Sequence, residues 1–270
     1  MIIFKSINKL NKEVNFKANI GFVPTMGSLH NGHISLIKSS IKNCDKTLVS
    51  IFINPSQFHK KSDLKNYPRN LKKDIKILKR FNIDYLLIPN IKEIYKNNED
   101  KKIKLSKKDK IMCGLYRPGH FEGVLAVINQ FLKQIKPKYI FLGEKDYQQL
   151  FLIKKFINKK FKVIVIPCKT IRDQNKVALS SRNSLLNKND LKKSSYIASL
   201  LLNLKNKLKK NIYFEYKVKN IFKKINNLNN IKVEYLEIRN KKNLSKNYNK
   251  NNFKIFLAYY NKKIRLIDNF

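Results

Sequence analysis

Cysteine, glycine, proline and tryptophan are scarce in this 270-residue sequence, which holds three cysteines, seven glycines, seven prolines and no tryptophan. Cys44, Cys113 and Cys168 lie far apart and are odd in number. Neither a disulfide framework nor a cysteine-rich zinc site is therefore indicated. We expect all three to be buried free thiols.

Long apolar runs are absent as well. No run approaches the ~20 residues that a membrane-spanning helix needs. Residues 1–14 alternate between apolar and polar positions, unlike the apolar centre of a signal peptide. With 43% hydrophobic residues, the chain is expected to be a folded cytoplasmic protein with no membrane partner.

Acidic residues number only 18 against 59 lysines and arginines, which gives a formal net charge of +41. Clustered basic residues would favour a nucleic-acid-binding protein. Here lysine is spread over almost every segment, together with many asparagines and isoleucines, as an A/T-rich coding sequence favours. We therefore expect no nucleic-acid partner, although the positive field should attract anionic substrates.

Short apolar runs alternate with helical patterns through the first 168 residues. Because these runs are continuously apolar, they are typical of parallel strands covered on both faces. The alternation predicts βαβ units and an α/β fold with a doubly wound parallel sheet. The expected strands are 20–23, 48–53, 85–88, 139–142 and 163–166, and the clearest helices are 34–41, 71–81, 124–135 and 150–157.

The pattern changes near residue 170, where we place a domain boundary. The second part should be a small α+β domain, because helical patterns are followed there by alternating segments typical of an antiparallel sheet. We therefore predict two domains, 1–169 and 170–270. The second is expected to hold a polar loop at 169–183, helices at 191–208 and 218–228, and strands at 231–238 and 254–260.

One connection in the first domain is unusually long. Residues 96–110 are charged and lead into 114–123, which contains three glycines and a proline. Connections of this length in compact domains are usually functional or disordered. We interpret 114–123 as a lid or a loop on the substrate side, and the lysine-rich part as solvated.

Two histidines, His30 and His33, stand where the first expected strand turns into the first expected helix. Backbone N–H groups at a helix N-terminus are unpaired and the macrodipole is positive there, so such a site favours anions. Gly27 and Gly32 leave room for the backbone to approach a ligand. We expect the imidazole donors to hold a phosphate chain.

His-x-Gly-His at a strand–helix junction resembles the HIGH signature of nucleotidyl transferases, although several enzyme classes share that signature alone. Seven blocks in order make the resemblance specific to the pantothenate synthetase (pantoate–β-alanine ligase) family. The blocks are 23–33, 49–58, 67–69, 117–121, 143–149, 178–183 and 265–269.

The resemblance implies a Rossmann-like doubly wound parallel sheet of order 3-2-1-4-5, and a smaller C-terminal α+β domain that closes over the active site. It also implies a cytoplasmic homodimeric ligase that uses ATP and Mg²⁺. ATP would adenylate the carboxylate of pantoate and release diphosphate. The amine of β-alanine would then displace AMP to give pantothenate.

The same resemblance assigns roles to particular residues, although it leaves the metal ligands unknown. The expected catalytic residues are His30, His33, Lys145 and Arg182, with His33 as the proton donor. Gln57 and Gln149 are expected to bind pantoate and β-alanine, in preference to the adjacent Gln148. The expected ATP-binding residues are Met26, Gly27, Ser28, Leu29, His30, Asn31, Gly32, His33, Gly143, Glu144, Lys145, Asp146, Ile171, Leu179, Ser180, Ser181 and Arg182.

Two of these segments should contribute charge to the nucleotide site. Gly143–Asp146 ends the fourth strand, which would place it at the strand-order reversal beside the first strand. There Lys145 can neutralise phosphate charge and Asp146 can accept a hydrogen bond from ribose. Leu179–Arg182 would complete the phosphate clamp, because an arginine can bind phosphate oxygens in a bidentate way.

One departure and two alternatives remain. Asn175-Lys176 stands where the family has an Asp-Gly turn, and a lysine at a glycine position puts the geometry of that loop in doubt.

Another HIGH-motif adenylate-forming enzyme, such as a class I aminoacyl-tRNA synthetase fragment, is disfavoured by the lack of a Lys-Met-Ser-Lys-Ser block. A basic nucleic-acid-binding protein would reveal itself by binding that weakens steeply with salt.

Overall fold

The structure is a computed structural model that describes residues 1–16, 18–95, 103–210 and 216–270. The chain divides into two compact units, Met1–Thr170 and Ile171–Phe270. Of the lysine-rich segment predicted to be solvated, residues 96–102 lie outside the described residues.

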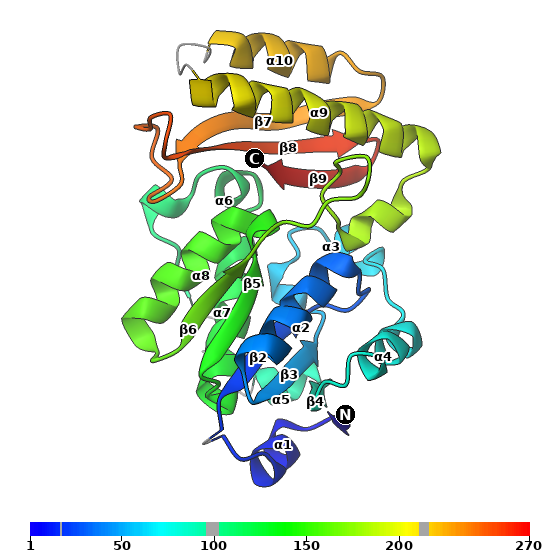
Figure 1. Cartoon of the computed structure of the whole chain (residues 1–270), viewed down its shortest axis with the longest axis vertical. Helices are drawn as coiled ribbons and strands as arrows, with labels where there is room; N and C mark the ends of the chain where they lie inside the picture. Colours follow the sequence, from blue (N-terminus) through cyan, green and yellow to red (C-terminus); the bar gives the residue numbers. More distant parts are fainter. Residues whose placement is uncertain (17, 96–102, 211–215) are drawn as a thin grey trace. The chain divides into compact units, whose positions relative to one another are not determined.

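The first unit is built on a six-stranded parallel sheet of order β1-β4-β3-β2-β5-β6 (Figure 1). Five of its strands are the predicted ones, and their arrangement confirms the order 3-2-1-4-5. The sixth strand, β1, was missed because its three residues carry no pattern of their own, and it pairs with β4 at the edge of the sheet. The strands are β1 (Ile2–Phe4), β2 (Ile20–Thr25), β3 (Lys46–Ile51), β4 (Tyr85–Leu87), β5 (Tyr139–Gly143) and β6 (Ile164–Cys168).

Helices cover both faces of this sheet, as β2 shows. Val23 packs in one core cluster with Ile37 of α2 and Leu78 of α4. The adjacent Phe22 points the other way, and its ring centroid lies 5.3 Å from that of Phe131 of α7, which packs beside α8. The helices are α1 (Ile7–Glu13), α2 (Asn31–Asn43), α3 (Lys61–Lys65), α4 (Leu71–Lys79), α5 (Ile91–Ile94), α6 (Cys113–Tyr116), α7 (His120–Ile135) and α8 (Tyr147–Lys160), with short 3₁₀ helices η1 (Pro55–Gln57), η3 (Lys107–Asp109) and η4 (Glu144–Asp146).

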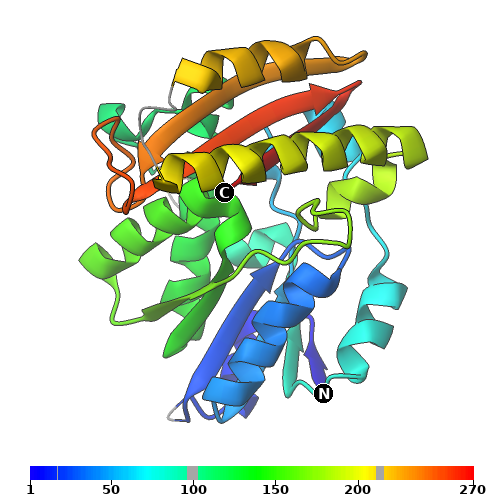
Figure 2. The same ribbon diagram turned by 45° about the horizontal axis from the view of Figure 1, so that its top comes forward.

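The second unit is an antiparallel sheet of order β7-β8-β9 with α9 and α10 packed on one face (Figure 2). The antiparallel sheet and both helices were predicted, whereas the last strand, β9, was not. Apolar residues of α9, such as Leu201 and Leu204, form the core with Ile255 and Leu257 of β8. The elements are η5 (Ser181–Leu185), α9 (Lys188–Lys210), α10 (Lys217–Asn226), β7 (Ile231–Asn240), β8 (Phe253–Asn261) and β9 (Ile264–Asn269).

Two features of the chain bear on the compositional expectations. All three cysteines are free; Cys113 and Cys168 are buried, while Cys44 is only half-buried. Among the helices of the described residues, none is both long enough and apolar enough to cross a membrane.

Candidate active site

The strands β2 and β5 lie side by side, and their parallel pairing aligns Gly21 with Tyr139. Because parallel strands end at the same edge of a sheet, the turn after β2 and η4 after β5 leave that edge next to each other. This edge is where the strand order reverses, the usual ligand-binding position in an open α/β sheet.

His30 and His33 form a reciprocal cap at the N-terminus of α2. Nδ1 of His30 accepts a hydrogen bond from the N–H of Gly32 at 3.1 Å, and Nδ1 of His33 accepts from the N–H of His30 at 3.4 Å. The two ring centroids are 4.1 Å apart. Since Nδ1 is the acceptor in both rings, the proton of each neutral imidazole lies on Nε2. Each ring therefore presents an N–H donor away from the cap.

Both histidines are neutral at physiological pH. The pKa of His33 is lowered from 6.5 to about 3, chiefly by burial and also by the nearby His30 and Lys145. Burial also lowers the pKa of His30 to about 4, with Lys145 acting in the same direction and Asp146 opposing it. The formal positive charge beside the rings comes from Lys145, whose Nζ lies 3.3 Å from Oδ1 of Asp146.

Several backbone N–H groups of the turn are already paired, which corrects the expectation that they are unpaired. The N–H groups of Ser28 and Leu29 each donate to the carboxylate of Asp74 at 2.8 Å. The N–H of Gly27 donates to Oγ1 of Thr25 at 3.2 Å. The donors presented to a phosphate chain at this turn are therefore the imidazole Nε2–H groups, supported by Lys145, rather than these amides.

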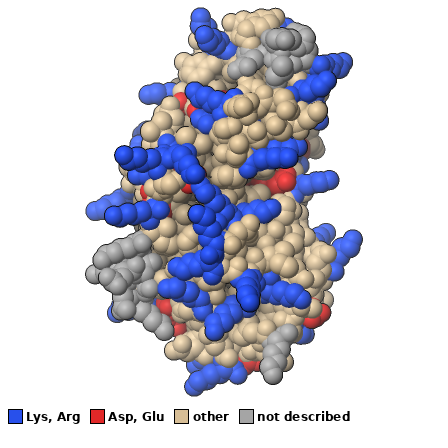
Figure 3. Space-filling view, turned by 90° about the vertical axis from the view of Figure 1, so that its left-hand side faces the viewer, with Lys and Arg blue, Asp and Glu red and all other residues tan. Residues whose placement is uncertain are grey.

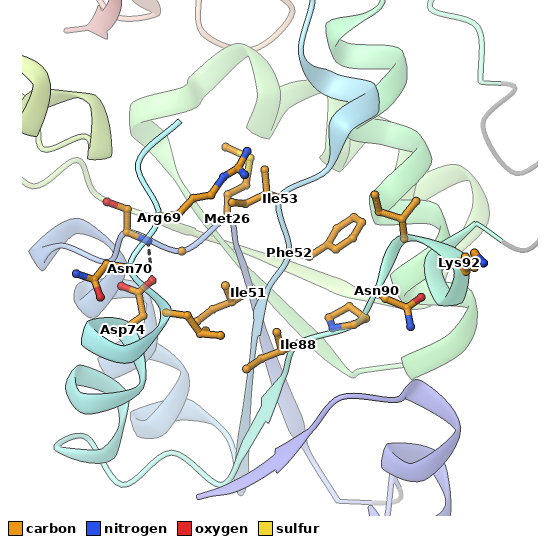
Figure 4. A pocket seen from close by; sticks show the side chains of 15 residues that line it. Met26, Ile51, Phe52, Ile53, Arg69, Asn70, Asp74, Ile88, Asn90 and Lys92 are labelled. Carbon is orange, nitrogen blue, oxygen red and sulfur yellow. Dashed lines mark hydrogen bonds between the residues drawn. The ribbon is translucent and has the colours of Figure 1, made fainter. Parts of the chain in front are cut away.

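Asp74, in the first turn of α4, is a residue that sequence reasoning missed. Its side chain is 2% exposed and reaches the turn after β2 (Figure 4). Gly27 has a φ of 76°, and a Cβ placed on it would lie 2.9 Å from Oδ2 of Asp74. The turn thus needs glycine for its conformation and for the close approach of the carboxylate. In the sequence, Asp74 is one acidic residue in an amphipathic helix, so no local signal marked it.

A pocket of about 650 Å³ opens beside this turn (Figure 4). Residues 26–28 line one side, Ile51 and Ile88 supply apolar wall, and Arg69 and Lys92 supply positive charge. The two glutamines predicted to bind the acid are not among its lining residues. A group bound in this pocket would therefore contact the turn that Asp74 holds.

The three glutamines differ in the contacts that their side chains make. Gln57 is 9% exposed, and its Nε2 donates to Sδ of Met26 at 2.7 Å, which brings it to the turn after β2. Gln148 is occupied, because its side chain accepts from and donates to the backbone of residues 111–113 at 3.1 and 2.7 Å. Gln149 is half-buried, and its side chain makes no hydrogen bond to another described residue. Of the adjacent pair, Gln149 is the one with a side-chain amide open to a ligand.

In the second unit, two of the predicted nucleotide residues, Ile171 and Leu179, meet in a narrow hairpin. The N–H of Leu179 donates to the carbonyl of Ile171 at 3.0 Å. Between them, Arg172 binds both carboxylate oxygens of Asp268, at 2.7 and 2.8 Å. Its guanidinium also donates to the carbonyl of Lys176 at 2.9 Å. The bidentate ion pair therefore ties the hairpin to β9.

The unusual Asn175-Lys176 turn closes this hairpin. Lys176 has a φ of 67°, the left-handed conformation that glycine adopts without strain. Oδ1 of Asp173 accepts from the N–H groups of Asn175 and Val177, both at 2.9 Å, and stabilises the turn. The loop thus forms without the glycine. Beyond it, the N–H of Arg182 donates to Oγ of Ser180 at 3.3 Å.

The surface charge follows the composition. In Figure 3, lysine and arginine side chains are scattered over the surface in view and far outnumber the acidic ones. Among the described residues, no group of three or more His, Cys, Asp or Glu side chains could hold a metal ion. A positively charged surface of this kind attracts anionic ligands of any class.

Comparisons with known proteins identify the family. The sequence model described as Pantoate-beta-alanine ligase matches residues 2–270. Pantothenate synthetase of Campylobacter fetus is 38% identical over 273 residues, covering 100% of this chain and 99% of that protein. A bifunctional pantoate ligase/cytidylate kinase of Prochlorococcus marinus is 43% identical over 260 residues, which span 94% of this chain but only 50% of that longer protein.

A solved structure agrees with these matches. The pantoate-beta-alanine ligase of Francisella tularensis, complexed with beta-gamma ATP and beta-alanine, superposes with a TM-score of 0.86 at 37% sequence identity. The likeness covers 100% of this chain and 97% of that one. The resemblance predicted from the sequence blocks is confirmed, and the chain belongs to the pantoate-beta-alanine ligase family.

Proposed function

We propose that this protein condenses pantoate with β-alanine to give pantothenate, using ATP and passing through a pantoyl-adenylate. The observation that carries the proposal is the family match over residues 2–270. The pair of neutral imidazole donors beside Lys145 at the strand-order reversal supports it, because adenylation needs such donors around a phosphate chain.

In the first step a carboxylate oxygen of pantoate attacks the α-phosphorus, and the bond from that phosphorus to the diphosphate breaks. Nε2–H of His30 and of His33 donate to phosphate oxygens, and Lys145 balances the charge that builds on them. With pKa values of about 4 and about 3, both histidines act as neutral hydrogen-bond donors. This refines the proton-donor role expected for His33.

In the second step the amine of β-alanine attacks the acyl carbon, and AMP leaves. Gln57 and Gln149 hold the two acids in this scheme, because an amide side chain donates and accepts at once. A thioether is a weak acceptor, so the Nε2–H₂ group of Gln57 exchanges its Met26 contact for a substrate oxygen at little cost.

The second unit supplies the remaining nucleotide contacts in this proposal. They are made by Ile171, Leu179, Ser180, Ser181 and Arg182. Arg182 binds phosphate oxygens, and movement of this unit would exclude water from the acyl-adenylate. The hairpin that carries Ile171 and Leu179 is closed by a hydrogen bond between these two residues, and Ser180, Ser181 and Arg182 follow it directly.

Magnesium is proposed to enter with ATP, as the complex of the ion with the triphosphate. Mg²⁺ is usually bound by one or two carboxylates together with substrate phosphates. Asp146 fits a single contact of this kind, because it lies beside His30 and is 43% exposed. The ion would supply charge neutralisation on the phosphates. Assembly as a homodimer and a cytoplasmic location belong to the same proposal.

The test is diphosphate release with ATP and pantoate alone, followed by AMP release when β-alanine is added. The proposal expects both, each dependent on Mg²⁺ and each missing when pantoate is left out. Turnover with a different acid in place of pantoate would change the substrate while keeping the reaction class. No diphosphate release with any carboxylic acid would overturn the proposed function.

A further inference from the structure

The main chain of η1, which carries Gln57, lies directly against the first turn of α7. A Cβ placed on Gly123 of α7 would lie 2.3 Å from the carbonyl oxygen of Ser56 and 2.7 Å from the N–H nitrogen of Gln57. No side chain fits in that space, so the glycine lets two backbones touch. The position of Gln57 is therefore set by α7.

His120, the first residue of α7, makes the shorter of two side-chain contacts with the Gln57 carbonyl, and the Arg117 guanidinium makes the longer one at 3.5 Å. His120 is 8% exposed, and its Nδ1 lies 2.7 Å from the carbonyl oxygen of Gln57. Its Nε2 lies 2.8 Å from a guanidinium nitrogen of Arg117. Because a guanidinium can only donate, Nε2 is an acceptor, and the proton of the neutral ring lies on Nδ1. His120 thus donates to Gln57 and is held in that tautomer by Arg117.

Asn54 holds the same segment from its other side. Its Nδ2 donates to the carbonyl of Gly123 at 3.0 Å and contacts Oε1 of Gln57 at 3.4 Å. Its Oδ1 accepts from the hydroxyl of Tyr95 at 3.0 Å. Both ends of Gln57 are therefore fixed, the main chain by His120 and the side-chain oxygen by Asn54.

We propose that His120 is a positioning residue that aims the amide of Gln57 at the acid substrates. The proposal rests on the proposed function, which assigns pantoate and β-alanine to Gln57. His120 touches neither substrate in this scheme and acts only through the Gln57 carbonyl. Its loss should weaken the binding of the acids and leave ATP binding unchanged.

A matched pair of variants distinguishes the hydrogen bond made by Nδ1 of His120 from the one made by Nε2. In His120→Asn the side-chain amide nitrogen can take the place of Nδ1 and still donate to Gln57. In His120→Gln the side-chain oxygen can take the place of Nε2, so the contact with Arg117 survives and the donor to Gln57 is lost. Both are neutral amides, so neither adds a charge to the interface.

We expect His120→Gln to raise the KM for pantoate about tenfold, because the Gln57 carbonyl loses its donor at 2.7 Å and keeps only the Arg117 guanidinium at 3.5 Å. The KM for ATP should stay within about twofold. His120→Asn should keep the pantoate KM within about threefold of the native value. Equal effects of both variants on pantoate, or an equal rise in the ATP KM, would overturn the proposal.

A spectroscopic measurement tests the hydrogen bond without any turnover. The chain has four histidines, so ¹⁵N-histidine labelling gives a tractable long-range ¹H–¹⁵N spectrum. We expect one ring in the Nδ1–H tautomer at neutral pH, whose signal disappears in His120→Asn. An Nε2–H or doubly protonated ring at that position would overturn the positioning role. Absence of pantoate turnover with an Nδ1–H ring would instead count against the proposed function.

Discussion

The turn at 26–30 and the hairpin at 171–179 are both predicted to contact ATP, yet different interactions hold them. In the first, amide N–H groups are bonded to buried side chains, above all to Asp74, which is 2% exposed. In the second, an ion pair between Arg172 and Asp268, 20% and 11% exposed, ties the hairpin to β9, and Asp173 supports a turn with an exposed tip. The first loop is held by buried side chains, and the second by contacts around an exposed tip.

The two loops also meet the same backbone requirement with different residues. Each needs one position in the left-handed region, at a φ of 76° for Gly27 and 67° for Lys176. Glycine is required at the first, where a carboxylate also approaches the Cα. Lysine is tolerated at the second, where the side chain is exposed and only the conformational cost remains. The proposed adenylation chemistry is therefore assigned to the loop with less conformational freedom.

Replacing His33 with asparagine should have the largest effect. The asparagine oxygen can replace Nδ1 as the acceptor for the His30 N–H, so the cap survives, but the Nε2–H donor is lost. We expect kcat/KM for diphosphate release to fall about 10²- to 10³-fold, with little change in melting temperature. The exposed His59→Asn is the control. Activity within tenfold of native in His33→Asn would show that the imidazole donor is not needed.

Asp74→Asn should disturb the first loop in a different way. An amide has one acceptor oxygen, so the N–H of Ser28 or of Leu29 would face an NH₂ group. We expect a loss of about 2–3 kcal/mol in the free energy of unfolding and about a tenfold or greater loss of kcat/KM. Urea unfolding and diphosphate release measure the two effects.

Asp84→Asn is the matched control, because Asp84 accepts from the backbone N–H of Thr47 at 2.9 Å, at the start of β3 rather than at the turn. It should lower stability and leave kcat/KM unchanged. If Asp74→Asn behaves in the same way, Asp74 holds the fold but does not set the geometry of the site.

Asp74 also marks the limit of what the sequence could predict. The order of five strands followed from apolar runs and from the resemblance, and the turn after β2 followed from its glycines and histidines. Asp74 contacts that turn from 46 residues away. Nothing near it in the sequence distinguishes it from a solvated helix charge, since only the tertiary fold brings it to the amides. The short strand β1 escaped detection for a related reason, because pairing with β4 defines it.

The reciprocal histidine cap was within reach of the sequence. His30 and His33 stand at the N-cap and N3 positions, the spacing of a capping box, although serine or threonine and glutamate usually fill those places. That spacing implies that the helix-terminal amides are paired to the rings. The expectation that these amides are unpaired was wrong, because the N–H groups of His30 and Gly32 donate to the rings of the two predicted catalytic histidines.

The buried histidines make the first loop sensitive to acid. Their pKa values in the fold are about 4 and about 3, below the value of 6.5 expected in the unfolded chain. Between the folded and the unfolded pKa values, the unfolded state binds more protons than the folded state. The contribution of the two histidines to stability is therefore complete above pH 6.5 and falls as the pH is lowered. Because one pKa unit corresponds to about 1.4 kcal/mol, we expect the free energy of unfolding to fall by about 2 kcal/mol or more between pH 7 and pH 5.

Urea unfolding of the native protein and of a His30→Asn, His33→Asn double variant measures this effect. The double variant should lose part of the pH dependence, whereas His59→Asn should retain all of it. An unchanged slope in the double variant would show that other groups cause the acid sensitivity.

Lys176→Gly should have the smallest effect on the free energy of unfolding. Unlike the other substitutions, it should stabilise the protein. Glycine removes the cost of a left-handed lysine, but it also gives the unfolded chain more freedom, so the net gain should be about 0.5–1 kcal/mol. Lys169→Gly is the control, because Lys169 is exposed and is not among the positive-φ residues, so glycine there should destabilise. Urea midpoints that move in opposite directions would show that the second loop carries backbone strain that the first avoids with Gly27. Midpoints that both fall would mean that the Asp173 contacts already remove that strain.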